Sequence, residues 1–103
     1  MLLAWLVFSD RRGAKRRPVL VIHDFGDDDL LVAPVTSQAA RIAADVAVSD
    51  WQGARLKLPS VVRVEKLATV AKSCVARKLG ALPTGDLARV GETLTTVFKQ
   101  IPG

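Results

Sequence analysis

The side chains that could do chemistry in this 103-residue chain fall into three short groups. The first is a basic run, the second is a segment rich in hydroxyl and amide groups, and the third is an Arg-x-Glu pair. Their members are Lys15, Arg16 and Arg17; Thr36, Ser37 and Gln38; and Arg63 and Glu65. Arginine and threonine can stabilise charge that develops on a phosphate, and a carboxylate can take up a proton. Together the groups favour chemistry at a phosphodiester.

Cleavage of RNA suits such a site because the neighbouring 2′-hydroxyl attacks the phosphorus, so neither external water nor a cofactor is needed. None of the three groups contains a histidine, and we therefore expect slow catalysis that depends on positioning. Arginine is almost never deprotonated in proteins, so Arg17 is interpreted as an electrostatic stabiliser or hydrogen-bond donor rather than a base. A nucleophilic pair of Ser37 and His23 lacks a third orienting residue at a recognisable spacing.

The basic run leads directly into a proline and four aliphatic residues, Pro-Val-Leu-Val-Ile. Proline is tolerated as the first residue of a strand, so the pattern predicts a strand over 18–23 with Arg17 where a loop enters the sheet. A guanidinium held there is pre-organised to bind phosphate through two parallel hydrogen bonds. The alternative interpretation is a solvated basic turn, since five of the fifteen basic residues lie between positions 11 and 17.

The Arg-x-Glu pair lies in a segment, 60–65, that alternates like a strand with one wet face. Residues two apart on a strand point the same way, so Arg63 and Glu65 are expected to share a face. The loop before this strand, residues 50–59, carries Arg55 and Lys57, which are further candidates for RNA contacts.

Hydrophobic patterning predicts a mainly β domain with one terminal helix. Strands are expected over 1–8, 18–23, 30–35, 46–49 and 60–65, with bent β structure over 66–76. From Thr84 to Ile101 the apolar residues recur every three or four positions, which is typical of an amphipathic helix that Thr84 could cap and Pro102 would stop. The whole chain, 1–103, is therefore expected to be a single α+β domain, a small and partly open barrel capped by the helix.

Composition limits the partners and the compartment. A net charge of +5 and an isoelectric point near 10 favour a polyanion or an acidic protein as the partner. The few aromatic residues argue against a surface built on base stacking and for one that binds backbone phosphates. Cys74 is the single cysteine, so no internal disulfide forms and the reducing cytoplasm is expected.

No metal site, cofactor or membrane span is expected from the sequence. One cysteine and one histidine cannot make a structural zinc site. The adjacent carboxylates of 27–29 diverge and lack the spacing of a calcium loop. The apolar opening, residues 1–8, is too short to cross a bilayer.

Four segments in order resemble the MazF/PemK (Kid) toxins of type II toxin–antitoxin systems. They are Lys15–Ile22, Val32–Gln38, Pro59–Thr69 and Lys78–Leu82. The resemblance implies an SH3-like barrel of the MazF/PemK/CcdB type and a homodimer. It also implies metal-independent cleavage of single-stranded mRNA at short sequences, and neutralisation by an acidic antitoxin.

The resemblance also implies roles for individual residues. Arg17 matches the catalytic arginine that precedes a proline, and Thr36 matches the threonine that works with it in MazF-like members. Arg63 and Glu65 match an Arg-x-Asp pair that PemK-like members use as acid and base. That branch also uses a histidine in the first loop, which this chain lacks, so the Arg17/Thr36 arrangement is favoured.

Two other classes of function stay open at the level of sequence. The first is an RNA- or antitoxin-binding barrel with impaired catalysis, because Met-Leu-Leu-Ala stands where family members usually carry Gly-Asp before the first strand. The second is a gyrase-binding poison like CcdB. CcdB toxins act through a C-terminal helix that ends in tryptophan, whereas this chain ends in Gln-Ile-Pro-Gly.

Overall fold

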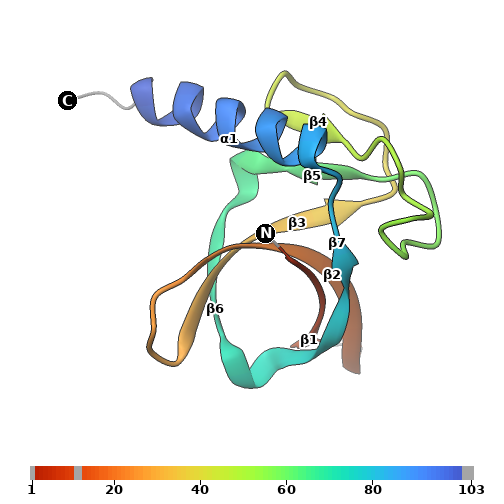
Figure 1. Cartoon of the computed structure of the whole chain (residues 1–103). Coiled ribbons are helices and arrows are strands. Elements are labelled where there is room, and N and C mark those ends of the chain that lie inside the picture. Colours follow the sequence, from red (N-terminus) through yellow and green to blue (C-terminus); the bar gives the residue numbers. More distant parts are fainter. Residues whose placement is uncertain (1, 11–12, 101–103) are drawn as a thin grey trace.

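The computed structural model describes residues 2–10 and 13–100, which form seven strands and one α-helix. The predicted class, mainly β with a terminal helix, is confirmed (Figure 1). Two 3₁₀ turns interrupt the second half of the chain. In order, the elements are β1 (Leu2–Asp10), β2 (Gly13–Asp24), β3 (Asp29–Thr36), β4 (Asp45–Ala47), β5 (Val61–Arg63), η1 (Val64–Lys66), β6 (Ala68–Ala71), η2 (Lys72–Cys74), β7 (Val75–Ala81) and α1 (Thr84–Lys99).

The strands form one strongly curved antiparallel sheet in the order β4-β5-β3-β2-β1-β7, and β6 pairs with β3 beside β5. In Figure 1 the strands β6, β3, β2, β1 and β7 curl into a ring. β6 and β7 are joined through η2 but are not paired with each other in the described part of the chain. The sheet is thus not closed, as the prediction of a partly open barrel required.

Both prolines in the central strands lie where a strand edge is open. β3 changes partner along one edge, from β6 up to Val32 to β5 from Val35 onward, and Pro34 falls between these pairings. β3 pairs with β2 only from Val19, so β2 also has an open edge at Pro18. A residue without an N–H is tolerated at such edges because no ladder bond is lost there.

The prediction that a loop ends and a strand begins at Pro18 was wrong. β2 already starts at Gly13, and β1 pairs with it from Gly13 to Leu20, with Pro18 opposite Trp5. The long partner strand β1 keeps the basic residues extended, because hydrogen bonds to β1 satisfy the backbone that sequence patterning assigned to a turn. Arg17 therefore lies within a strand instead of at its entrance.

Successive residues of the central strands face two separate apolar clusters. Leu3, Leu20 and Ala33 belong to the larger cluster, which also takes in Val90 and Leu94 of α1. Their sequence neighbours Ala4, Val19 and Val32 belong to a smaller cluster on the other face of the sheet. This alternation follows from the two-residue period of a strand. The smaller cluster lies on the face that carries the site described below.

The helix begins as predicted at Thr84, but Thr84 does not cap it. Pro83 occupies the N-cap position without a side-chain cap, and Thr84 is the first helical residue. Asp86 in the first turn is 1% exposed and accepts a hydrogen bond from the Ser49 N–H at 2.9 Å. It also pairs with Arg89. The helix start is thus tied to the segment after β4 by a buried carboxylate. The predicted helix end at Ile101 lies outside the described residues.

Replacing Asp86 with alanine is expected to lower the free energy of unfolding by about 2 kcal/mol. The change removes the buried carboxylate that accepts the Ser49 N–H and pairs with Arg89, and a hydrogen bond to a charged group contributes roughly 1.5–3 kcal/mol. Urea denaturation of the two proteins measures the difference. Thr95→Ala, an exposed change on the same helix, is the control, and an equal loss in both variants would contradict the assigned role of Asp86.

At the opposite end of the sheet, Lys72 donates to the Asp24 carboxylate at 2.9 Å. This hydrogen bond, followed by one from the Gly26 N–H, lowers the pKa of the Asp24 carboxyl below 3.8. A lowered folded-state pKa stabilises the fold above the unfolded value, and the gain is lost as the pH falls through the folded value. We expect Asp24→Asn to lower the melting temperature slightly at neutral pH and to leave it unchanged near pH 2. A thermal unfolding series over pH measures this, and an equal loss at both pH values would refute it.

Candidate active site

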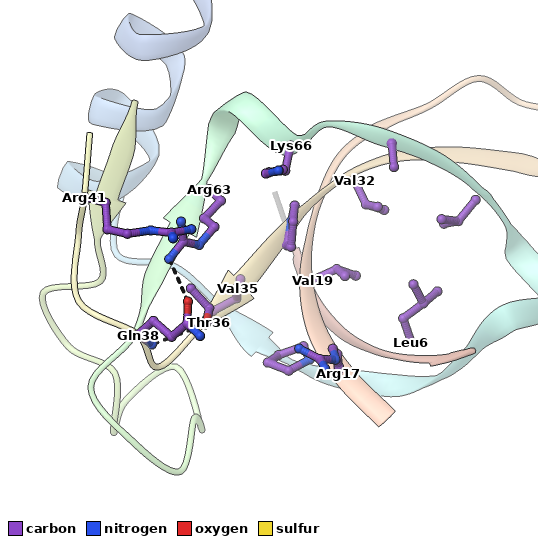
Figure 2. A pocket seen from close by; sticks show the side chains of 14 residues that line it. Leu6, Arg17, Val19, Val32, Val35, Thr36, Gln38, Arg41, Arg63 and Lys66 are labelled. Atoms are coloured by element: carbon purple, nitrogen blue, oxygen red, sulfur yellow. Dashed lines mark hydrogen bonds between the residues drawn. The ribbon is translucent and has the colours of Figure 1, made fainter. Parts of the chain in front are cut away.

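Arg17 and Thr36 lie near the point where the pairing of β2 with β3 stops. The last pair is Val19 with Pro34, and Arg17 and Thr36 each lie two residues beyond it on their strands. Residues two apart share a face of a strand, so both side chains point to the same side of the sheet as that pair. Arg17 and Thr36 both line a cavity of about 380 Å³, called here the cationic pocket (Figure 2). Arg17 is exposed and Thr36 is half-buried, so solvent and ligands can reach both.

Four cations line the cationic pocket, and none of its lining residues is acidic. The cations come from different parts of the chain and are Arg17, Arg41, Arg63 and Lys66. Thr36 and Gln38 add polar groups, and the floor is apolar, formed by residues such as Leu6, Val19, Val32 and Val70. Cations over low-dielectric walls focus the field and attract anions. The pocket can therefore hold an anionic group beside an apolar surface.

The Thr36 hydroxyl is oriented by its own backbone. Its oxygen accepts a hydrogen bond from the Gln38 N–H at 3.2 Å, in a turn just after β3 ends. A hydroxyl has one donor and two acceptor positions, so this bond leaves its hydrogen for another acceptor. A phosphate oxygen in the pocket could be that acceptor.

Arg63 belongs to a buried network at one wall of the pocket. It is 5% exposed, its Nη2 donates to Gln38 Oε1 at 3.2 Å, and its Nη1 lies 3.7 Å from Asp45 Oδ2 (Figure 2 shows the bond to Gln38). The same Asp45 oxygen accepts the backbone N–H of Arg41 at 2.8 Å. The Arg63–Asp45 pair thus joins the end of β5 to the segment that carries Gln38 and Arg41.

The predicted common face of Arg63 and Glu65 is wrong. β5 ends at Arg63, and the chain turns into η1, which contains Glu65. Val61 to Val64 are all buried, so the segment has no wet strand face, and the turn places Val64 in the core while Glu65 is exposed. Glu65 does not line the cationic pocket. An acid–base role for this pair stays a prediction.

The other predicted RNA-binding residues separate between faces. Gln38 lines the cationic pocket, whereas Ser37 lines a small depression beside Trp5. Arg16 and Lys57 line a cleft around the same tryptophan. Lys15 and Arg55 do not line the cationic pocket, and Arg55 has a φ of 65°, in the left-handed region.

Two cations of the pocket were missed from the sequence. Arg41 is the single charged residue between Ser37 and Ala44, and Lys66 directly follows Glu65. Lys66 lies within the resemblance segment Pro59–Thr69, and Arg41 lies three residues after the segment Val32–Gln38. These positions were the available signal. Within the described residues, no three histidine, cysteine, aspartate or glutamate side chains gather as metal ligands do. The described helices include none with the length and apolar character needed to cross a bilayer.

The fold is a curved antiparallel sheet with a terminal helix, and it carries a pocket of four cations beside β2 and β3. These features define a class of small basic α+β proteins with an anion-accepting site. The chain belongs to the family of PemK-like, MazF-like toxins of type II toxin–antitoxin systems, whose model matches residues 3–98. No curated protein matches the chain in sequence.

Solved structures show the same fold. A MazE–MazF complex from Deinococcus radiodurans aligns with a TM-score of 0.78 and 25% identity, over 95% of this chain and 92% of that one. The Mycobacterium tuberculosis toxin MazF-mt6 aligns with a TM-score of 0.73 and 24% identity, over 93% and 96%. A mycobacterial endoribonuclease in complex with its cognate antitoxin aligns with a TM-score of 0.72 and 19% identity, over 100% and 98%.

Proposed function

We propose that this toxin is an endoribonuclease that cleaves single-stranded RNA at short sequences, without a metal ion, in the cationic pocket. The observation that carries the proposal is that Arg17 and Thr36 line one cavity that has four cations and no acidic residue in its lining. A relative of the same fold is an endoribonuclease, which supports the choice of RNA as the polyanion.

In the proposed reaction the 2′-oxygen forms a bond to phosphorus, the bond from phosphorus to the 5′-oxygen breaks, and a 2′,3′-cyclic phosphate and a 5′-hydroxyl result. The 2′-hydroxyl loses its proton and the departing 5′-oxygen gains one. Arg17 donates two parallel hydrogen bonds to the non-bridging oxygens, and Thr36 donates one more. These bonds strengthen as the phosphorane gains charge, which lowers the barrier.

The other pocket residues position the strand in this scheme. Arg41 and Lys66 neutralise phosphates on either side of the scissile one, and the apolar floor accepts the sugar or base. The lining contains neither histidine nor a carboxylate, so positioning and charge stabilisation supply most of the rate. Glu65 acts as the proton acceptor only if the strand reaches beyond the pocket to η1.

Incubation of the toxin with a mixed RNA pool, in the presence and absence of EDTA, tests the proposal. We expect cuts at a short recurring sequence, unchanged by EDTA, with 2′,3′-cyclic phosphate ends. RNA that is bound but not cut would place the chain among non-catalytic binders. Cleavage that EDTA abolishes would reject the metal-independent mechanism.

We further propose a homodimer and an acidic antitoxin as the partners in the cell. The net charge of +5 favours an acidic binder, which would order part of its chain on contact. The structural relatives include a MazE–MazF complex and an endoribonuclease with its antitoxin. Light scattering of the purified toxin, alone and with the product of an adjacent acidic reading frame, would measure both assemblies.

A further inference from the structure

A second cationic cavity lies around Trp5, on the opposite face of β1 from the cationic pocket. Its volume is about 300 Å³, and it is lined by Trp5, Arg16, Lys57 and Arg77; we call it the Trp5 cleft. The indole is half-buried and the three cations are exposed. Leu6, the next residue of β1, lines the cationic pocket instead, as expected for neighbouring residues of a strand.

Strand pairing explains why the three cations surround the indole. Arg77 of β7 is the direct partner of Trp5, and Arg16 is two residues from Pro18, the partner of Trp5 on β2. Side chains at direct and diagonal positions on one face of a sheet reach one another. Lys57 comes from the loop before β5, and its ammonium lies 5.7 Å from the centre of a Trp5 ring.

Three like charges around one aromatic ring repel one another unless an anion is present. Among the residues that the structure describes, no carboxylate forms an ion pair with Arg16, Lys57 or Arg77. The cleft therefore presents an aromatic surface together with uncompensated positive charge. A nucleotide, with a flat base and a phosphate, complements both features.

The Trp5 cleft and the cationic pocket each share lining residues with a third hollow. A depression of about 150 Å³ shares Trp5 and Lys57 with the cleft and Pro18 with the pocket. Ser37 also lines this depression, and its sequence neighbours Thr36 and Gln38 line the pocket. A strand that extends from Thr36 toward Trp5 would therefore meet Ser37 and this depression.

We propose that the Trp5 cleft binds a nucleotide of the same RNA strand, on one side of the scissile phosphate. This inference rests on the proposed ribonuclease function. The base stacks on the indole and displaces the Lys57 ammonium toward a phosphate, because an exposed cation–π contact is weaker than base stacking. Stacking tolerates every base, so the cleft adds affinity without narrowing the cleavage sequence. An acidic peptide would satisfy the cations but leave the path to the pocket unexplained.

Binding of an uncleavable strand tests this site apart from catalysis. The probe is a fluorescein-labelled 2′-O-methyl oligouridylate of about twelve nucleotides, whose blocked 2′-oxygens cannot attack. We expect Arg77→Gln to weaken binding and to flatten the dependence of log K on log salt by about 0.7, the slope of one phosphate contact on a single strand. Lys78→Gln is the matched control, because Lys78 is the next residue of β7, equally exposed, and does not line the Trp5 cleft.

Stacking has its own readout. In a Trp51→Phe background Trp5 is the only tryptophan, and we expect the probe to quench its fluorescence. Trp5→Leu is expected to weaken binding roughly tenfold and Trp5→Phe to restore most of it, since phenylalanine can still stack. Thermal unfolding of each variant verifies that the protein remains folded.

The outcomes separate the cleft from the nuclease. Equal losses in Arg77→Gln and Lys78→Gln, or an unquenched Trp5, would overturn the inference. The inference would also be overturned if binding of an oligoglutamate peptide depended on Arg77 and quenched the fluorescence of Trp5, while binding of the oligonucleotide did neither. If the probe behaves as expected but no RNA is ever cut, the cleft is a nucleic-acid site and the proposed function fails.

Discussion

Arg17→Ala is expected to slow RNA cleavage by about a hundredfold to a thousandfold, the usual loss for one donor to a developing oxyanion. Arg17 and Thr36 line the same cavity, so the Arg17 guanidinium can donate to a phosphate held there. Arg17→Lys keeps the charge but not the paired donors, and we expect a rate between those of wild type and alanine. Single-turnover rates with enzyme in excess measure the chemical step.

Two controls accompany the Arg17 variants. Lys78→Ala removes one positive charge outside the cationic pocket and is expected to keep more than about half of the activity. Thr36→Val is nearly isosteric and removes the hydroxyl, so a loss of roughly tenfold to a hundredfold is expected. If the Arg17→Ala and Lys78→Ala variants cleaved RNA at the same rate, the chemistry would take place elsewhere on the molecule.

Arg63→Met is expected to lower the free energy of unfolding by about 3–5 kcal/mol, the usual cost of breaking a buried ion pair. The Asp45 side chain is 0% exposed, so without Arg63 its charge remains buried and uncompensated. Removing both charges of a buried pair often leaves the stability unchanged, so the double variant Asp45→Asn/Arg63→Met should regain most of the lost stability. The asparagine carbonyl can still accept the Arg41 N–H. Urea denaturation of the wild type, the single variant and the double variant measures their free energies of unfolding.

The same double variant distinguishes two roles for Arg63. If Arg63 mainly positions Gln38 and Arg41, the refolded double variant should cleave RNA within about tenfold of wild type. A double variant that is as stable as wild type but loses activity as fully as Arg17→Ala would show that Arg63 acts on the phosphate directly. Glu65→Gln provides the comparison for the predicted acid–base pair, since Glu65 is exposed and lies outside the cationic pocket.

Local patterns predicted most of the elements and placed their exact ends poorly, and β7 was not among the predicted strands. The aliphatic runs indicated the central strands, and the three- to four-residue spacing indicated α1, because burial of one face imposes a period. The boundaries at Pro18 and Arg63 were wrong for a common reason. Whether β2 continues back to Gly13 depends on β1, and whether β5 continues past Arg63 depends on how deeply Val64 is buried.

Local sequence was enough to identify the side chains available for phosphate chemistry and their likeness to a toxin family. The signals were Arg17 before a proline, Thr36 after an aliphatic run, and a strong positive charge. How these side chains are grouped depends on the folded chain. It joined Arg41 and Lys66 to the cationic pocket, turned Glu65 away, buried Arg63 against Asp45, and surrounded Trp5 with cations from three segments. These groupings depend on the register between strands and on where the connecting turns fold back. Register arises from packing between residues far apart in sequence, which no local pattern encodes.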